Sequence, residues 1–370
     1  MLQDQFFEIA NTHFDEALPF VLYRKPNTNA IKGLFQNDNN IHTSKHLKDS
    51  GFVFAPFNTE EQTVLIPIEN SSSIETNFTF QEQENVYKEQ DENSIDAKAF
   101  HVQLVTKAIN AINNNEFKKV VLSRKETINL SEANPIKLFQ RLLKVYSKAF
   151  VYCWYHPKVG LWLGATPETL ISITGNRFTT MALAGTQKDE GHNTINWEAK
   201  EIEEQELVTS FIENNLKPLV QNIIIGAAET IKAGNLLHIK TRISGTINSN
   251  LESLIKALHP TPAVCGFPKE ESKQFILKNE NYNREYYTGY LGELNIKEKA
   301  TRNTNRRNVE NNVYTSIKTV SNLYVNLRCM QLTDSKASLY IGGGITKDSN
   351  PGNEWKETVN KTSTMKKVLF

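Results

Sequence analysis

Three strand-like runs follow one another between residues 149 and 185 with only short turns between them. They read "AFVYCWYHP", "GLWLGAT" and "ETLISITGNRFTTMALAG". Similar runs recur elsewhere in the chain, broken by a few long helix-like segments such as 98–117 and 197–216. Strands in antiparallel-like runs with few helices favour an α+β fold over a parallel, doubly wound sheet. The pattern predicts a single large domain with mainly antiparallel β-sheets flanked by helices.

The overall composition argues against several classes of protein. The chain has 370 residues, of which 39% are apolar, and a formal net charge of +1. This charge gives no overall field that would attract nucleic acid or a membrane surface. Cys153, Cys265 and Cys329 are far apart and form no CxxC pair. The sequence therefore suggests neither a disulfide framework nor a structural zinc site.

No targeting pattern is visible in the sequence. The first residues, "MLQDQFFEIANTHF", lack a basic region followed by an apolar run, which a signal peptide would show. No stretch approaches the ~20 apolar residues of a membrane span. We therefore expect a soluble cytoplasmic protein with no membrane or nucleic-acid partner. We also expect a monomer, because no apolar seam stands out.

Two polar segments interrupt the pattern of helices and strands. Residues 69–96 are rich in Ser, Glu and Asn, which predicts a linker or a surface excursion. Residues 297–316 are rich in Lys, Arg and Asn and predict a mobile loop. No aromatic side chains are interleaved with its basic residues, as binding of single-stranded nucleic acid would require.

Two pairs of glutamates have the spacing of neighbours on one helix face. Glu201 and Glu204 are three residues apart in "NWEAKEIEEQELV", and Glu354 and Glu357 repeat this spacing in "GNEWKETVNKTSTM". Two such pairs on two helices can close around a hard cation such as Mg²⁺. The alternative is that both pairs lie on solvated helix faces. The glycine-rich turn "IGGGITKDSNPG" precedes the second pair and either cradles an anion or marks a tight turn.

Three further residues stand out by their surroundings. Glu168 follows Thr166-Pro167 at the end of a strand, either at a pocket rim or in the first turn of a helix. Arg328 lies inside the apolar strand "VNLRCMQL", where it needs a carboxylate or phosphate partner or an internal salt bridge. His259 belongs to the rigid segment "LHPTPAVCGFP", and its alternatives are a core histidine and a site residue.

Two lysines precede the buried strand "VVLS". Side chains alternate along a strand, so one of Lys118 and Lys119 points to the same side as Val121 and Ser123. That lysine is either a solvated strand end or a group inside a pocket.

These segments together resemble the chorismate-utilising enzymes. The resemblance covers about residues 97–370 and includes "KKVVLSR", "LGATPETL", "ALAGT", "KEIEEQELV", "LHPTPAVCGFP", "YNREYYTGYLGE", "VNLRCMQL", "YIGGGIT" and "NEWKETVNKTSTM". It implies an α+β fold like that of anthranilate synthase component I. It also implies that 97–370 is the chorismate-binding catalytic region and that 1–96 is a variable N-terminal portion of the same compact fold.

The resemblance further implies a reaction and a set of roles. Family members that add water have lysine where Lys119 stands, and members that add ammonia have glutamine. The implied activity is isochorismate synthase, which adds water at C2 of chorismate and removes the C4 hydroxyl. Lys119 is then the base and Glu168 the acid. Glu204 and Glu357 match the direct Mg²⁺ ligands, and Glu201 and Glu354 match an outer pair. The residues that match substrate-binding positions are Gly185, Thr186, His259, Val264, Tyr287, Arg328, Gly342, Gly343, Gly344 and Lys361.

Other functions remain as alternatives. A salicylate synthase shares the lysine, the acid and the glutamates, and adds elimination of pyruvate. A non-catalytic chorismate-binding protein is disfavoured because both Lys119 and Glu168 are present. A phosphoryl-transfer enzyme is disfavoured because no P-loop or kinase-type loop occurs. Gln205 follows Glu204 where the family often has histidine, which leaves the predicted ligands unchanged.

Overall fold

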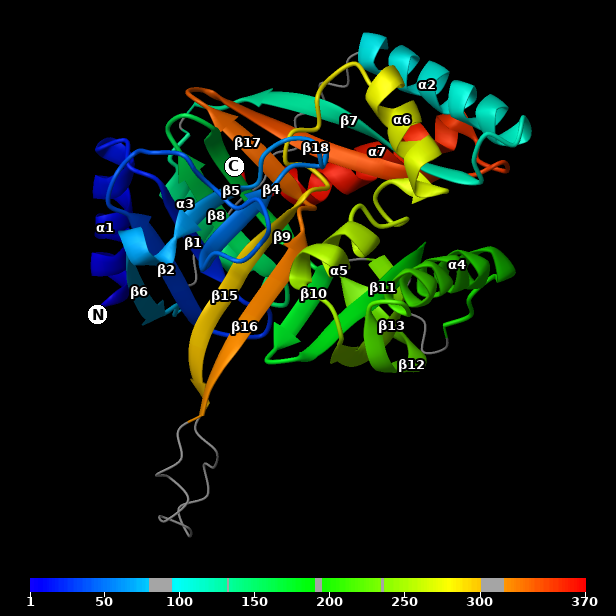
Figure 1. The fold of residues 1–370 in the computed structure, drawn as a ribbon. Coiled ribbons are helices and arrows are strands. Elements are labelled where there is room, and N and C mark those ends of the chain that lie inside the picture. The colour runs from blue at the N-terminus through cyan, green and yellow to red at the C-terminus, as the bar shows by residue number, and fades with distance from the viewer. Residues whose placement is uncertain (80–94, 132, 190–194, 234–235, 301–315) are drawn as a thin grey trace.

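The computed structural model describes residues 1–79, 95–131, 133–189, 195–233, 236–300 and 316–370 (Figure 1). Within these residues the strands form two nine-stranded sheets, and every strand pair is antiparallel. The predicted α+β class with mainly antiparallel sheets is confirmed. No helix in this described part is long and apolar enough to cross a membrane.

The first sheet contains strands from both the N-terminal and the C-terminal parts of the chain. Its spatial order is β14 (Gly266–Phe267), β7 (Lys119–Asn129), β18 (Lys336–Ile345), β17 (Cys329–Thr333), β9 (Gly160–Thr166), β8 (Phe150–His156), β1 (Phe20–Arg24), β2 (Ala30–Gln36) and β6 (Ser71–Asn77).

The second sheet also contains strands that are far apart in the sequence. Its spatial order is β12 (Val220–Ala233), β13 (Leu236–Ile247), β11 (Arg177–Lys188), β10 (Thr169–Thr174), β16 (Ser316–Val325), β15 (Tyr290–Ala300), β4 (Gly51–Ala55), β5 (Val64–Pro67) and β3 (His42–Thr43).

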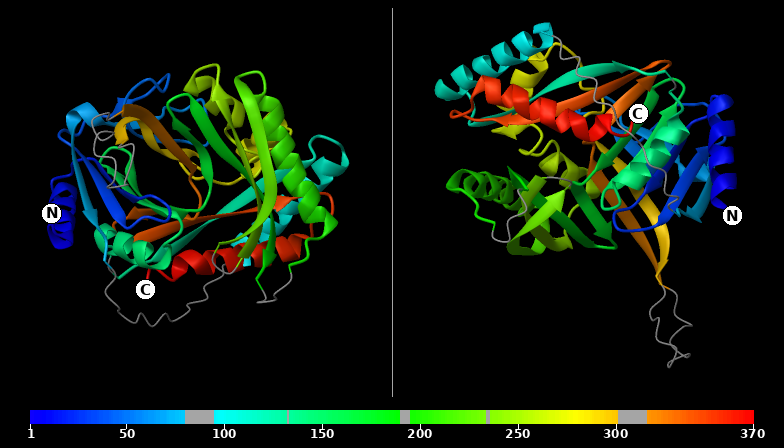
Figure 2. Two further views of the ribbon diagram at one scale, coloured as in Figure 1. Left: turned by 90° about the horizontal axis from the view of Figure 1, so that it is seen from below. Right: turned by 180° about the vertical axis from the view of Figure 1, so that it is seen from behind.

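Helices cover the outer faces of the two sheets. They are α1 (Gln3–Asp15), α2 (Ile95–Asn113), α3 (Pro135–Val145), α4 (Ala199–Leu216), α5 (Leu251–Leu258), α6 (Lys269–Asn279) and α7 (Pro351–Lys366), with a 3₁₀ turn at Ile68–Asn70. One apolar core lies between the first sheet and α1 and α3, and a second lies between the second sheet and α4 and α5. Seen from behind, α2 and α7 lie together on one side of the molecule and α4 on the other (Figure 2).

An aromatic core lies between the two sheets. Phe54 of β4 contacts Trp154 of β8 with ring centroids 4.9 Å apart, and Phe150 of β8 stacks on Tyr324 of β16 at 4.1 Å. Offset and tilted aromatic pairs of this kind add stability beyond the area that they bury. This core fixes the two sheets against each other on one side, while their other ends diverge around a cavity.

Two of the connections at which the chain changes from one sheet to the other lie next to each other. The link from β9 to β10 is Pro167-Glu168, and the link from β16 to β17 contains Arg328. Hydrogen bonds join the two links, from Val325 N to Glu168 O at 3.0 Å and from Ala165 N to Arg328 O at 3.1 Å. The backbones of these two charged residues are therefore held side by side where the chain crosses between the sheets.

Three sequence-based predictions about individual segments need correction. Arg328 does not lie inside a strand: its backbone has φ +48° between β16 and β17, because the chain must turn there to enter the other sheet. The predicted linker 69–96 contains the edge strand β6, whose polar residues face solvent, and its last residues begin α2. Its residues 80–94 lie outside the described part.

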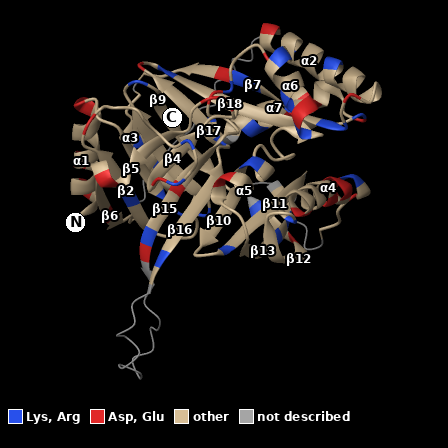
Figure 3. Ribbon diagram, viewed as in Figure 1, with Lys and Arg blue, Asp and Glu red and all other residues tan. Residues whose placement is uncertain are grey.

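The prediction of a loop over 297–316 is wrong at its two ends, where the structure has paired strands. Paired strands continue to Ala300 and resume at Ser316 in a hairpin that projects from the body of the molecule (Figure 1). The charged residues of this hairpin suit strands that have both faces exposed to solvent. Residues 301–315 lie outside the described part. Acidic and basic residues are interspersed over the described ribbon, in keeping with the small net charge (Figure 3).

Candidate active site

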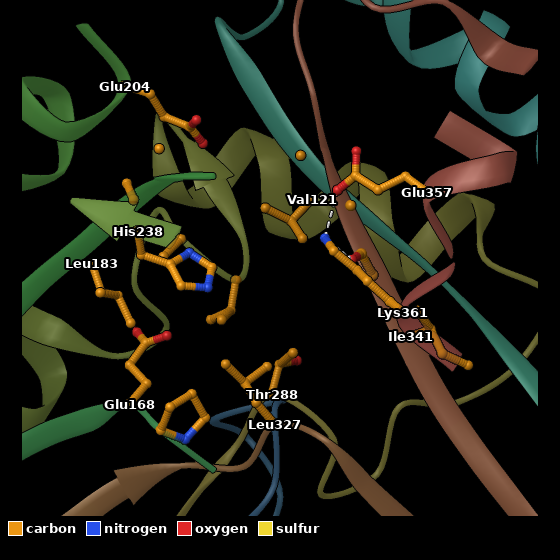
Figure 4. Close-up of a pocket in the computed structure, with 18 of the residues that line it drawn as sticks. Val121, Glu168, Leu183, Glu204, His238, Thr288, Leu327, Ile341, Glu357 and Lys361 are labelled. Carbon is orange, nitrogen blue, oxygen red and sulfur yellow. Dashed lines mark hydrogen bonds and ion pairs between the residues drawn. The ribbon is translucent and has the colours of Figure 1, made fainter. Parts of the chain in front are cut away.

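A cavity of about 2210 Å³ lies between the diverging ends of the two sheets. One wall comes from β7, β18 and α7, and the facing wall comes from β11, β13 and α4. Figure 4 shows Glu204 and Glu357 on opposite sides of this cavity, with His238 and Glu168 on the same side as Glu204. Charged side chains from both sheets thus converge on one space large enough for a small organic acid.

Strand β7 places Lys119 in the cavity. Lys119 and Val121 line the cavity, whereas Val120 and Leu122 pack in the apolar core beneath α2 and α6. This alternation is the period of two expected of a strand. Lys119 is only 4% exposed, while Lys118 is exposed. Both lysines contribute to the cavity lining, but of the two only Lys119 is buried.

The ammonium group of Lys119 contacts the opposite wall. Its Nζ donates a hydrogen bond to Oε1 of Glu204 on α4. Burial acts to raise the pKa of Glu204, but the positive charge of Lys119 and its hydrogen bond lower it more, so the net pKa lies below the ordinary value. A Cβ atom on Gly344 would lie 3.1 Å from Cε of Lys119. The glycine therefore leaves room for the lysine side chain along β18.

Glu168 is a buried acid on the cavity floor. Its side chain is 6% exposed and lines the cavity. Burial raises the pKa of its carboxyl to about 7, although the positive charge of Lys119 acts in the opposite direction. The carboxyl is therefore partly protonated near neutral pH and can donate a proton to a leaving group.

A bulge in β11 shapes the wall beside α4. The register of β11 against β13 shifts between Ala184 and Thr186, and Gly185 at the bulge has φ +66°. A Cβ atom on Gly185 would lie 3.0 Å from the carbonyl oxygen of Glu201. The backbone of Gly185 hydrogen-bonds to Glu204 and contributes to its low pKa. Glycine is required here because α4 approaches closely and the backbone is left-handed.

His238 is a cavity residue that the sequence did not reveal. It lies on β13, and its imidazole projects between Glu204 and Glu168 (Figure 4). Burial and the nearby charges of Arg328 and Lys361 lower its pKa to about 4, so the ring is neutral at physiological pH. The segment "LLHIK" gave no signal, since one histidine in an alternating strand looks the same whether it faces a cavity or a core.

Helix α7 presents three charged side chains to the cavity. Glu354, Glu357 and Lys361 line the cavity, with spacings of three and four residues. Lys361 Nζ lies 2.6 Å from Oε1 of Glu357 and donates to the carbonyl of Gly342 at 3.1 Å. Burial raises the pKa of Glu354, and the charge of Glu357 adds to this shift.

The glycine triad lies on β18 directly beside β7. Gly342, Gly343 and Gly344 pair with Ser123, Leu122 and Val121 and line the cavity. A Cβ atom on Gly342 would lie 2.7 Å from the hydroxyl oxygen of Tyr287. Tyr287 and Val264 also line the cavity, as expected from the resemblance.

Arg328 completes the charged lining. Its side chain faces the cavity, and burial lowers its pKa from the ordinary value of arginine. Within the described residues no carboxylate forms an ion pair with it. A half-buried guanidinium without an internal counter-ion is suited to bind an anionic ligand.

Of the two remaining predicted site residues, His259 and Thr186, only His259 has a described side chain. His259 is buried outside the lining and packs edge-on against Tyr290 of β15, with ring centroids 5.1 Å apart. Helix α5 ends at His259, and the ring packs against the second sheet; its predicted contact with substrate stays a prediction. The backbone of Thr186 continues β11 past the bulge, and its side chain lies outside the described residues.

The four glutamates line one cavity, but their carboxylates are not arranged around a common metal position. Among the described residues no group of three acidic, histidine or cysteine side chains is close enough to hold an ion. Glu204 and Glu357 each contact a lysine instead. Oε2 of Glu201 is buried without a hydrogen-bond partner, and the pKa of Glu354 is raised. An all-carboxylate set with such groups fits a hard cation in its chemistry.

Most residues of the cavity lining lie in a region that matches a known protein family. A model of the family described as "Chorismate binding enzyme" matches residues 52–301 and 314–370, which include the whole cavity lining apart from Pro26 and Asn27. The chain belongs to the chorismate-binding enzymes. The matched region begins well before residue 97, where the resemblance in the sequence was placed.

Individual relatives carry related names. The chain is 29% identical over 304 residues to isochorismate synthase EntC of Escherichia coli K12. The aligned region covers 79% of this chain and 72% of that protein. Among solved structures, MenF of Escherichia coli, a menaquinone-specific isochorismate synthase, superposes with a TM-score of 0.75 at 19% identity, covering 95% of this chain and 89% of that one.

A second solved structure shows how widely the fold is shared. Anthranilate synthase component I of Streptococcus pneumoniae superposes with a TM-score of 0.66 at 16% identity, covering 94% of this chain and 92% of that one. At such identities the superpositions establish the fold alone.

Proposed function

We propose that this chorismate-binding enzyme is an isochorismate synthase. It would add water at C2 of chorismate and release the C4 hydroxyl, giving isochorismate. The observation that carries the proposal is the pairing, in one cavity, of a buried lysine and a buried glutamic acid whose pKa is about 7. Similarity to proteins named isochorismate synthase supports it.

Lys119 is proposed as the general base. Water is a weak nucleophile, so its proton must be removed as it attacks carbon, and an amine in a buried pocket can do this when it is neutral. Ammonia needs no such base, which disfavours an amination reaction for a chain with lysine at this position. Lys119 enters the cavity from the wall that carries the glycine triad.

Glu168 is proposed as the general acid. Hydroxide is a poor leaving group, so the C4 oxygen must receive a proton as its bond to carbon breaks. Burial keeps the carboxyl of Glu168 protonated at a higher pH than an exposed glutamate would allow. Glu168 reaches the cavity from the crossing between the two sheets, whereas Lys119 enters from β7.

The substrate's carboxylates would be bound by the cationic and backbone groups of the same cavity. We assign Arg328 and Lys361 to these contacts, with N–H donors from the glycine triad on β18. Glu204 and Glu357 would hold Mg²⁺ directly, and Glu201 and Glu354 would act as the outer pair. Bound there, Mg²⁺ would offset the substrate's negative charge and fix its orientation.

A product assay tests the proposal. Purified protein, chorismate and Mg²⁺ are incubated, and the products are separated by chromatography. Isochorismate as the sole product supports the assignment. Salicylate with pyruvate would identify a salicylate synthase, and anthranilate formed from added ammonium would contradict the role given to Lys119. Light scattering of the same preparation would check our expectation of a monomer, and cell fractionation our expectation of a cytoplasmic enzyme.

Removing a predicted metal ligand should remove the response to metal. For Glu357→Ala we expect the Mg²⁺-dependent activity to fall by on the order of 10²-fold or more, because carboxylates supply the binding oxygens. Activity and heat of binding are measured while Mg²⁺ is titrated. Glu206→Ala is the control, since Glu206 is an exposed residue of α4 outside the cavity lining. An unaltered Mg²⁺ titration for Glu357→Ala would exclude this ligand set.

Substitution of Arg328 should weaken substrate binding more than it slows the chemical step. For Arg328→Met we expect KM to rise about 10- to 100-fold, which corresponds to one charge-assisted hydrogen-bonding group. Arg242→Met is the matched control, because Arg242 is an exposed arginine of β13 outside the cavity lining. The comparison is made by steady-state kinetics over a range of chorismate concentrations. Equal KM values for the two variants would remove Arg328 from the substrate contacts.

A further inference from the structure

A buried ion pair lies against β7 just outside the cavity. Glu280 and Arg284 have side chains only 2% exposed, and their closest atoms are 2.6 Å apart. Neither residue lines the cavity. The carboxylate of Glu280 accepts two hydrogen bonds from Arg284 and two from Ser123, one from its N–H and one from its hydroxyl, all between 2.6 and 2.8 Å. The pair is thus fully occupied by protein groups and has no capacity left for substrate.

The pair completes an edge of β7 that lacks a strand. Strand β14 has only two residues and pairs with Lys119 and Val120. Beyond them, the same edge of β7 is met by side chains: Arg284 Nη2 donates to Val121 O at 2.7 Å, and Glu280 accepts from Ser123 N. An unpaired strand edge at this depth would leave buried N–H and C=O groups unsatisfied. The ion pair therefore replaces the missing neighbour strand.

The same guanidinium holds two further parts of the cavity wall. Arg284 Nη1 donates to Val264 O at 3.1 Å and to Thr288 Oγ1 at 3.2 Å. Val121, Val264 and Thr288 all line the cavity. The guanidinium also lies 4.6 Å from the ring centroid of Phe57. One side chain thus fixes three separate segments of the wall relative to one another.

The position of β7 decides where Lys119 lies. Across its other edge β7 pairs with the glycine triad, and Gly344 packs directly against the lysine side chain. A sideways shift of β7 would move Lys119 relative to Gly344 and to Glu168 on the floor. Small misplacements of reacting groups are costly, by about 10²-fold in rate for about 1 Å.

We infer that Glu280 and Arg284 are positioning residues that hold the catalytic lysine strand in register with the rest of the active site. The inference rests on the proposed function for its effect on turnover. Its structural part, the immobilisation of β7, is independent of any substrate.

The experiment compares two buried glutamates that differ in location. Glu280→Gln tests the pair, and Glu293→Gln is the control, because Glu293 is also 2% exposed and lies in an ion pair with Lys25 away from the cavity lining. For Glu280→Gln we expect kcat to fall by on the order of 10²-fold with KM within about threefold. We also expect faster hydrogen exchange of the amides of residues 120–124. For Glu293→Gln we expect kcat and this exchange to match the unmodified protein.

Two additional variants keep the test decisive. Arg284→Lys keeps the charge but cannot hold two carbonyls and the carboxylate together, so it should not restore kcat. Ser123→Ala removes one hydroxyl contact to Glu280, and we expect about a three- to tenfold loss of kcat with local exchange increased. It serves as the test if Glu280→Gln does not fold.

The outcomes separate the two levels of the inference. Normal kcat and normal exchange of β7 in Glu280→Gln and Ser123→Ala, even with a lower melting temperature, would show that the pair only stabilises the fold and would overturn the inference. If the unmodified protein does not convert chorismate, the proposed function fails. The exchange of residues 120–124 still decides whether the pair holds β7.

Discussion

Lys119→Gln is expected to abolish the conversion of chorismate to isochorismate, with a loss of kcat of about 10³-fold or more. The reason is that glutamine cannot accept a proton from water, and a positioned base contributes about 10²–10⁴-fold. The substitution also removes the cation beside Glu204 without adding a bulky group to the cavity. Chorismate should still bind, because the groups assigned to its carboxylates remain. Kinetics give the first quantity and calorimetry gives the second.

Lys118→Gln is the matched control for this experiment. Lys118 is the preceding residue and is exposed, and it does not contact Glu204. We expect its kcat to stay within about threefold, as is usual for substitutions at exposed positions. Turnover by Lys119→Gln at a rate near that of Lys118→Gln would refute the assignment of the base. Formation of anthranilate from ammonium by Lys119→Gln would, in contrast, agree with the role of the lysine in selecting water.

Glu168→Gln is expected to reduce kcat by about 10²–10⁴-fold, because the amide cannot protonate the leaving hydroxyl. Its control is Glu285→Gln, since burial also raises the pKa of Glu285 but this residue lies outside the cavity lining. Circular dichroism of both variants checks that they are folded. Near-normal turnover by Glu168→Gln would show that another group supplies the proton.

The dependence on pH gives an independent measure of the same carboxyl. The acid form of Glu168 is the active one, and burial raises its pKa to about 7. As the pH rises through 7 the carboxyl loses its proton, so kcat/KM of the unmodified enzyme should fall on the alkaline side of about 7. The profile of kcat/KM reports the pKa values of the free enzyme. In Glu168→Gln this alkaline decrease should be absent from the remaining activity.

The sequence predicted the class of fold and several charged residues of the cavity lining. Strand-like runs with short turns predicted antiparallel sheets, and the alternation in "KKVVLS" predicted that one lysine faces a pocket. Helical spacing predicted that each glutamate pair shares a face, and Glu201, Glu204, Glu354 and Glu357 do line one cavity. These features are local, since they depend on the period of a strand or a helix within a few residues.

Other features of the site could not be obtained from local patterns. His238 and His259 lie in segments that look equally suitable, yet only His238 projects into the cavity. Arg328 was predicted inside a strand, but the chain turns there to change sheets. Whether a side chain faces a cavity or a core depends on which distant segments pack against it. The spacing of apolar residues within one segment does not show which distant segments these are.

The sequence by itself determined which residues alternate along each strand, which carboxylates share a helix face, and where glycine permits a close approach. The tertiary structure alone decided that β7 meets α4 through Lys119 and Glu204, that Glu168 and Arg328 lie at adjacent crossings, and that Glu280 and Arg284 close an open strand edge. The physical reason is the range of the forces involved. Backbone periodicity is fixed within a few residues, whereas burial, pKa and ion pairing depend on contacts between segments far apart along the chain.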